Sequence, residues 1–198
     1  MGALHVFTGP MFSGKSEALI RRIRRAREAD LDVQVFVPSL DDRHGVGQVR
    51  SHAGEDLTQY GIGVWPVSEE NLAQVAPRVR AATRVVAFDE AQFFGPEVVV
   101  QVRALLARNL TLYVAGLDRD YRDEPFGCMP QLLALADHVY KLTAICAYCK
   151  RDAARQTFRQ VADRTQVLVG GHEAYAALCR PCYGRATDAL GVRSKTGG

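Results

Sequence analysis

The feature that most constrains this chain is the run G-P-M-F-S-G-K-S at residues 9–16. The run fits the pattern G-x-x-x-x-G-K-[ST] and stands between a short apolar segment, Leu4–Thr8, and a stretch at residues 16–30 whose apolar side chains recur at helical spacing. A strand, a glycine-rich loop and a helix in this order are typical of a phosphate-binding loop. The alternative is a glycine-rich turn that merely starts a helix.

The residue types in this run suit phosphate chemistry. Glycines allow backbone N–H groups to approach phosphate oxygens, and the start of a helix adds positive potential. Lys15 would reach the terminal phosphates of a nucleotide, and the hydroxyl of Ser16 would bind Mg²⁺. We therefore expect nucleotide contacts from the whole run: Gly9, Pro10, Met11, Phe12, Ser13, Gly14, Lys15 and Ser16.

Short apolar runs alternate with helical stretches along the chain. The expected strands are residues 4–8, 33–37, 63–67, 85–88, 111–115 and 138–142. The expected helices are residues 16–30, a segment that begins after Ser68, and residues 96–108. This alternation predicts an α/β fold with an open, largely parallel sheet, helices on both faces, and ligands beyond the carboxyl ends of the strands.

Length and composition predict one domain of ordinary size with a small appendage. The 198 residues are 47% hydrophobic and 24% charged, which excludes a disordered, collagen-like or disulfide-dense chain. We expect a nucleotide-binding domain at residues 1–143, a small module at residues 144–190 and a disordered tail at residues 191–198. Within the module, residues 156–159 and 165–169 are expected to form a hairpin.

Charge and targeting signals narrow the partners and the compartment. The net charge of +3 is too small to imply nucleic-acid or membrane binding. The N-terminus lacks a basic segment followed by an apolar stretch, and no apolar run reaches the roughly 18 residues of a membrane span. The expected location is therefore the cytoplasm.

Two adjacent carboxylates, Asp89 and Glu90, end the apolar run at residues 85–88. Enzymes with a phosphate-binding loop need a carboxylate near Mg²⁺. Because side chains alternate along an extended chain, we expect Asp89 to face the metal and Glu90 to face an attacking hydroxyl or water, from which it could accept a proton. The alternative is that one or both cap a nearby helix.

Four of the five cysteines form two C-x-x-C pairs: Cys146, Cys149, Cys179 and Cys182. Four thiolates in two pairs favour tetrahedral Zn²⁺, although the spacer at residues 150–178 is longer than usual. Protein ligands would fill every coordination position, so the zinc is expected to be structural. A redox role is the alternative, and Cys128 is expected to be a small buried side chain.

Together these motifs resemble the thymidine kinase family that carries a zinc-binding lobe. The resemblance covers roughly residues 4–183 and rests on residues 9–16, 89–94, 116–118 and 125–127 together with the paired cysteines. It implies transfer of the γ-phosphate of ATP to the 5′-hydroxyl of thymidine, giving dTMP, with Mg²⁺ present and a homotetrameric assembly.

The resemblance also implies roles for single residues. Asp89 would position Mg²⁺, Gln92 would lie at the nucleotide, and Glu90 would take the proton of the 5′-hydroxyl. The nucleoside would be held by ten residues, partly through backbone groups: Met11, Leu117, Tyr121, Phe126, Gln166, Val167, Leu168, Val169, Gly170 and Tyr175. For Tyr121, Phe126 and Tyr175, the alternative is that each packs in the hydrophobic core.

The chain departs from the family in places. A threonine after the second cysteine often helps to hold the base, and here both Thr157 and Gln156 are candidates for that place.

Asp41 and Arg43 match an Asp-x-Arg pattern in the long loop expected at residues 39–62, where Arg43 would approach phosphate.

Two other functions compete with a nucleoside kinase. The first is a nucleic-acid-binding ATPase whose contact surface would be the zinc-binding lobe and the arginines of the helix expected at residues 16–30: Arg21, Arg22, Arg24, Arg25 and Arg27. The second is a regulatory module that binds nucleotide without catalysis, which the presence of Glu90 disfavours.

Overall fold

The computed structural model describes residues 2–39, 62–163, 165–166, 168 and 170–189. Its centre is a six-stranded parallel sheet in the order β3-β2-β4-β5-β1-β6, as the alternating pattern predicts. The strands are β1 (Leu4–Thr8), β2 (Asp32–Pro38), β3 (Val64–Val67), β4 (Thr83–Phe88), β5 (Thr111–Gly116) and β6 (His138–Lys141). Each contains one of the predicted runs or agrees with it to within about a residue.

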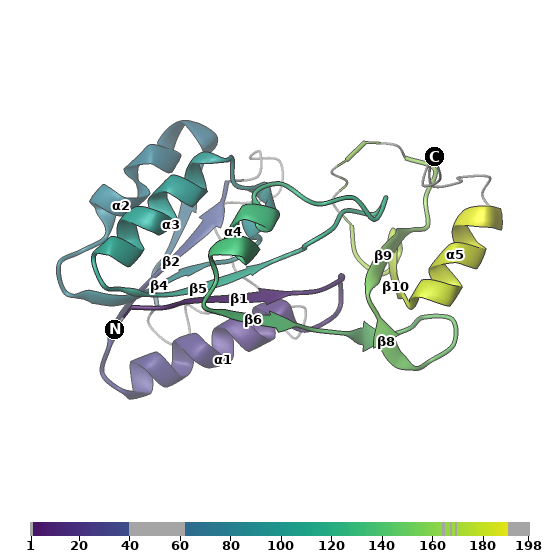
Figure 1. Cartoon of the computed structure of the whole chain (residues 1–198), viewed down its shortest axis with the longest axis horizontal. Coiled ribbons are helices and arrows are strands. Elements are labelled where there is room, and N and C mark those ends of the chain that lie inside the picture. Colours follow the sequence, from purple (N-terminus) through teal and green to yellow (C-terminus); the bar gives the residue numbers. More distant parts are fainter. Residues whose placement is uncertain (1, 40–61, 164, 167, 169, 190–198) are drawn as a thin grey trace.

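Helices cover both faces of this sheet, so the predicted α/β class is confirmed (Figure 1). Helix α1 (Lys15–Glu28) buries Leu19, Ile20 and Ile23 on one face, because these residues recur at helical spacing. The opposite face of the sheet packs against α2 (Val75–Arg78), α3 (Glu97–Ala107) and α4 (Met129–Leu135). No helix in the described part of the chain is long and apolar enough to cross a membrane.

The segment after Ser68 differs from the predicted helix. Ser68 holds the N-cap position without a side-chain cap bond, and a 3₁₀ helix, η3 (Glu69–Gln74), precedes the four-residue α2. Pro77 explains the break, because a proline is tolerated in the first turn of an α-helix and not further inside it. The α-helical register therefore restarts at Val75.

A smaller body follows β6 and has its own hydrophobic core around Phe158 and Leu178 (Figure 1). Its elements are β7 (Ala144–Ile145), β8 (Asp152–Ala154), β9 (Gln156–Arg159), β10 (Tyr175–Leu178) and α5 (Arg180–Ala189). The predicted hairpin is wrong in its second strand, since β9 pairs antiparallel with β10 and the described residues of 165–169 are not a strand. Every residue of β10 is buried, and that tertiary burial outweighs the higher strand propensity of the apolar run before Gly170.

Candidate active site

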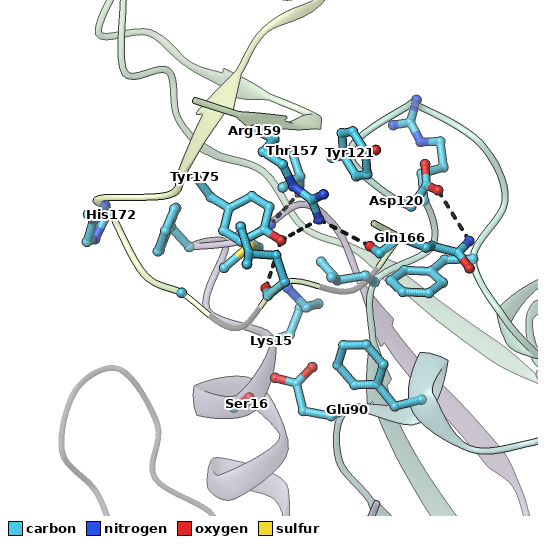
Figure 2. A pocket seen from close by; sticks show the side chains of 18 of the residues that line it. Lys15, Ser16, Glu90, Asp120, Tyr121, Thr157, Arg159, Gln166, His172 and Tyr175 are labelled. Atoms are coloured by element: carbon cyan, nitrogen blue, oxygen red, sulfur yellow. Dashed lines mark hydrogen bonds between the residues drawn. The ribbon is translucent and has the colours of Figure 1, made fainter. Parts of the chain in front are cut away.

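A cavity of about 650 Å³ opens at the carboxyl ends of the parallel strands, where the fold class predicts a ligand. Its wall comes from the loops that follow β1, β4 and β5 and from residues of the smaller body between Thr157 and Tyr175 that the structure describes. Figure 2 shows Lys15 and Glu90 on one side of it and Arg159 with Tyr121 and Tyr175 on the other. The site therefore combines both bodies of the chain.

The loop between β1 and α1 depends on glycine at its two ends. Gly9 has φ 148°, and a Cβ there would lie 2.5 Å from the carbonyl oxygen of Leu142. Gly14 adopts a left-handed conformation at the N-cap of α1, which has no side-chain cap. The first N–H groups of the helix are therefore left for another acceptor, as a phosphate site requires.

Five of the eight predicted phosphate-loop residues line the cavity: Met11, Phe12, Gly14, Lys15 and Ser16. The other three shape the loop, for example through the hydrogen bond that the Ser13 hydroxyl donates to the Pro10 carbonyl at 2.8 Å. Lys15 is buried, and its ammonium donates to the same carbonyl at 2.7 Å. Burial lowers the pKa of Lys15, while the charges of Glu90 and two aspartates act in the opposite direction.

Asp89 and Glu90 are directed differently, as predicted. Asp89 is buried and accepts a hydrogen bond from the Ser16 hydroxyl at 3.2 Å. Burial raises the pKa of Asp89, and the charge of Glu90 raises it further. A cation beside Ser16 would offset both effects, so the pair fits a Mg²⁺ site.

Glu90 lines the cavity and has a left-handed backbone, with φ 51°. It stands at the N-cap of the short helix η4 (Ala91–Phe93) but makes no capping bond with its side chain, which argues against the capping alternative for this residue. Because a non-glycine residue in this conformation is uncommon, the surrounding structure must hold Glu90 where it is.

Gln92 provides part of that restraint. It is buried and absent from the cavity wall, which differs from the expected contact with nucleotide. Its side-chain N–H donates to the Glu90 carboxylate, and its side-chain oxygen accepts from the backbone N–H of Leu117 at 2.9 Å. Gln92 thus connects the loop after β4 to the loop after β5.

All eight predicted nucleoside residues that the structure describes line the cavity: Met11, Leu117, Tyr121, Phe126, Gln166, Leu168, Gly170 and Tyr175. Val167 and Val169 lie outside the described residues, as do Asp41 and Arg43. The ring of Phe126 packs edge-on against Phe93, which also lines the cavity, with ring centroids 5.5 Å apart. These aromatic side chains give one part of the wall an apolar surface.

The structure distinguishes Thr157 from Gln156, the two candidates for the position of the family's base-binding threonine. Thr157 lines the cavity, and its hydroxyl accepts a hydrogen bond from the backbone N–H of Met11 at 3.0 Å. Gln156 is buried away from the cavity wall. Neighbouring residues of a strand face opposite ways, so only one of the two could reach the site.

Several lining residues were not predicted, above all Arg159 at the end of β9. Arg119, Asp120 and His172 also line the cavity, and the His172 ring stacks on Phe12 with centroids 3.8 Å apart. No local pattern in the sequence indicates Arg159, because an arginine at the end of a short strand is usually exposed.

The four cysteines predicted as ligands come together. Their sulfur atoms all lie within 4.8 Å of one another, and the Sγ atoms of Cys149 and Cys179 are 3.7 Å apart. Thiolates at about 2.3 Å around one tetrahedral ion would lie about 3.8 Å apart, so the cluster fits Zn²⁺ with no coordination position left for water. This closed geometry favours a structural site over a redox pair.

Cys128 lies elsewhere, as predicted. It is buried at the start of α4, and its thiol donates a hydrogen bond to the carbonyl of Ala91 at 3.1 Å. Burial raises the pKa of Cys128 to about 11. At neutral pH it is therefore a protonated packing residue.

Comparison with known proteins agrees with this geometry. The thymidine kinase family model matches residues 2–183. The chain is 46% identical to the thymidine kinase of Deinococcus deserti over 188 residues, covering 90% of this chain and 93% of that protein. It is 45% identical to the thymidine kinase of Deinococcus radiodurans over 188 residues, covering 90% and 88%.

A more distant likeness exists among solved structures. The flagellar accessory protein FlaH from Methanocaldococcus jannaschii aligns with a TM-score of 0.48 and 11% identity, over 71% of this chain and 70% of that chain. The assignment rests on the family match and on the two relatives. This chain belongs to the thymidine kinase family.

Proposed function

We propose that this chain transfers the γ-phosphate of ATP to the 5′-hydroxyl of thymidine and so produces dTMP. One observation supports this most directly: Glu90, the proposed base, lies in the same cavity as Lys15 and as the predicted nucleoside residues. A phosphate-binding end, a carboxylate and an aromatic end in a single cavity are what a nucleoside kinase requires.

The loop at residues 9–16 would hold the phosphates of ATP. Its glycines and the uncapped start of α1 would present backbone N–H groups to the phosphates. The Lys15 ammonium would give up its hydrogen bond to the Pro10 carbonyl and contact the β and γ phosphates instead. Ser16 and Asp89, which share a hydrogen bond, would hold Mg²⁺, and the ion would neutralise phosphate charge.

Glu90 would accept the proton of the 5′-hydroxyl as that oxygen attacks the γ-phosphorus atom. The hydrogen bond from Gln92 orients the carboxylate, and the other carboxylate oxygen is then left for the substrate. Phosphoryl transfer depends mainly on position and charge stabilisation, so Lys15 would neutralise the transferring phosphoryl group while the fixed carboxylate of Glu90 would take up the proton.

The nucleoside would occupy the aromatic end. Met11, Leu117 and Phe126 offer apolar surface, whereas Thr157 offers a hydroxyl for the base or for the loop that it already contacts. Residues 166–170 would pair with the base edge through backbone groups.

The remaining expectations, from the sequence and from the resemblance, belong to the same proposal. Residues 1–143 would form the nucleotide-binding domain and residues 144–190 a lobe that one structural Zn²⁺ stabilises. The chain would assemble as a homotetramer in the cytoplasm, with no nucleic-acid or membrane partner.

A panel of nucleosides with ATP labelled in its γ-phosphate tests the proposal. We expect labelled thymidine 5′-monophosphate, in amounts that depend on added Mg²⁺, and little product from purine nucleosides. ATP binding without transfer to any nucleoside would instead support a regulatory module. ATP hydrolysis that is stimulated by DNA, with a steep salt dependence, would support the nucleic-acid alternative.

A further inference from the structure

The side chain of Arg159 donates hydrogen bonds to several backbone oxygens at the edge of the cavity. The residue is only 4% exposed. One terminal nitrogen donates to the carbonyls of Asp163 and Thr165, and the other donates to the carbonyl of Gln166 at 3.2 Å and to the Tyr175 hydroxyl at 2.8 Å. The Tyr175 hydroxyl in turn donates to the carbonyl of Leu168 at 2.8 Å (Figure 2).

The same guanidinium also contacts two aromatic rings. It lies over Tyr121 at 3.7 Å from the ring centroid and over Tyr175 at 5.3 Å. Tyr121 belongs to the loop after β5, whereas Tyr175 begins β10 of the smaller body. Arg159 therefore fixes two separate parts of the cavity wall relative to one another.

The described residues of the wall between β9 and β10 are held largely through side chains. Among its described residues from 161 to 168, no backbone group is seen to bond to another backbone group. Side chains supply contacts there: the Asp163 carboxylate accepts from the backbone N–H and the hydroxyl of Thr165, and Gln166 donates to Asp120 at 3.3 Å. The hydrogen bonds from Arg159, together with the one from Tyr175 to Leu168, connect this wall to the sheet of β9 and β10.

We propose that Arg159 is a positioning residue that sets the affinity for the nucleoside by holding Thr165, Gln166 and Leu168 at the cavity edge. Without it, these residues would have to be ordered when the ligand binds, and that cost would weaken binding. Lys15 and Glu90 make none of the hydrogen bonds described for Arg159. The main effect should therefore fall on substrate binding and not on the chemical step.

Lysine is an informative replacement, because Arg159→Lys keeps the charge but loses the flat fork that both donates to several carbonyls and stacks between rings. Since this inference rests on thymidine being the substrate, its test needs one readout that does not use thymidine. Hydrogen–deuterium exchange of the peptide covering residues 160–172 supplies that readout.

In Arg159→Lys we expect the KM for thymidine to rise at least about tenfold, while kcat and the KM for ATP change less than about threefold. Exchange in residues 160–172 should become faster. Tyr175→Phe, which removes only the hydroxyl between Arg159 and Leu168, should show a smaller change in the same direction. Melting temperature and zinc content establish that each variant is folded.

Arg108→Lys is the matched control, because Arg108 also donates to two backbone carbonyls, those of Ala76 and Val79, but does not line the cavity. It should leave KM and exchange in residues 160–172 unchanged. The inference would be overturned if a folded Arg159→Lys variant had the KM for thymidine of the wild type. It would also be overturned if hydrogen–deuterium exchange in residues 160–172 of that variant were as slow as in the wild type. If the unmodified enzyme does not phosphorylate thymidine, the proposed function fails, and the exchange measurement still decides whether Arg159 holds this wall.

Discussion

The hydroxyl oxygen of Thr157 accepts a hydrogen bond from the backbone N–H of Met11 at 3.0 Å. Thr157 belongs to strand β9 of the smaller body, and Met11 belongs to the loop between β1 and α1. Both residues line the cavity, so this bond connects the proposed phosphate end to the proposed nucleoside end. The ring contact between Phe12 and His172 crosses the same boundary.

Replacement of Thr157 tests this connection. Thr157→Val keeps the shape of the side chain but leaves the part-buried N–H of Met11 without its acceptor, a loss of about 1–3 kcal/mol. We expect kcat/KM for thymidine to fall about tenfold or more, whereas Thr157→Ser, which keeps the hydroxyl, should stay within about threefold of the wild type. Equal kinetics in the valine and serine variants would show that this bond does not matter for activity.

Replacement of Glu90 tests the proposed base. Glu90→Gln retains the size of the side chain but cannot accept a proton, so kcat should fall about 100-fold or more. The affinity for ATP, measured by calorimetry, should change little because Lys15 and the rest of the loop remain. Glu28→Gln, on the exposed end of α1, is the control and should have wild-type kcat. Unaltered turnover in Glu90→Gln would remove this residue from the mechanism.

Local pattern was sufficient to predict the sheet and the loop at residues 9–16. The strands are short β-branched runs, and Gly9 and Gly14 occupy backbone conformations that other residues rarely adopt. The strand runs and the spacing of the glycines in the loop are both patterns among residues that are close in sequence. Most of the nucleoside side of the cavity wall was also predicted, but that part came from resemblance to a family, since spacing alone does not distinguish Tyr121 from a core residue.

The break of the helix after Ser68 has a local cause in Pro77, but two other wrong or missing predictions involve contacts between distant residues. The pairing of β9 with β10 follows from burial against the core around Phe158, and the weakly strand-like sequence of β10 gives little sign of it. The role of Arg159 depends on carbonyls that the fold brings within reach of its side chain. A single sequence does not contain that information in any local pattern.

Removal of the metal tests the cysteine site. We expect about one Zn²⁺ per chain, and Cys179→Ser should lose most of it, because three thiolates hold the ion less well than four. The melting temperature should fall by about 5 °C or more, and a strong chelator should have the same effect on the wild type. Cys128→Ala should keep its zinc, because Cys128 is not part of the cluster. A stable, active protein without metal would contradict a structural zinc site.

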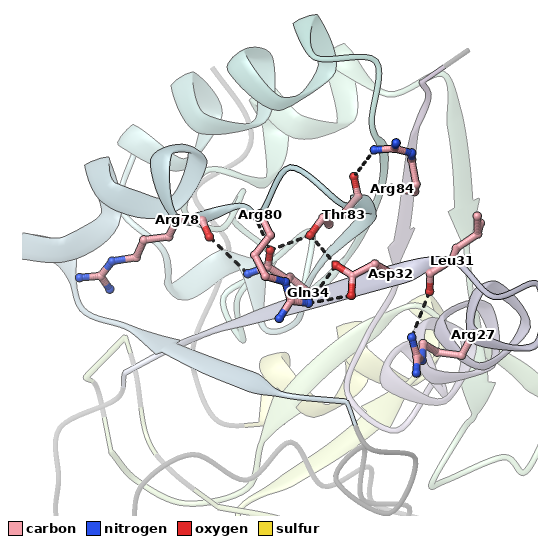
Figure 3. A network of polar contacts seen from close by, with 8 residues as sticks. All are labelled: Arg27, Leu31, Asp32, Gln34, Arg78, Arg80, Thr83 and Arg84. Atoms are coloured by element: carbon pink, nitrogen blue, oxygen red, sulfur yellow. Dashed lines mark hydrogen bonds and ion pairs between the residues drawn. The ribbon is translucent and has the colours of Figure 1, made fainter.

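A polar network around Asp32 predicts how stability depends on pH (Figure 3). The Asp32 carboxylate accepts hydrogen bonds from Arg80 at 2.8 Å and from the Thr83 hydroxyl at 2.7 Å. Burial raises the pKa of Asp32, but the hydrogen bonds from Thr83 and Arg80 outweigh burial, so the pKa lies below its usual value. The charged carboxylate therefore stabilises the fold above the pKa of the unfolded chain, about 3.9, and this contribution disappears as the pH falls through the lower folded-state pKa.

Asp32→Asn should therefore lower the free energy of unfolding by about 1 kcal/mol at pH 7, because a neutral amide accepts these hydrogen bonds more weakly. The difference from the wild type should shrink as the pH falls below about 4, where the wild-type carboxylate also becomes protonated. Denaturant unfolding of both proteins at each pH measures this difference, and acid-induced loss of bound metal, which both proteins share, cancels in it. Glu28→Gln should differ little from the wild type at any pH, because Glu28 is exposed. A difference for Asp32→Asn that is the same at pH 7 and pH 3 would mean that the charge of Asp32 does not stabilise the fold.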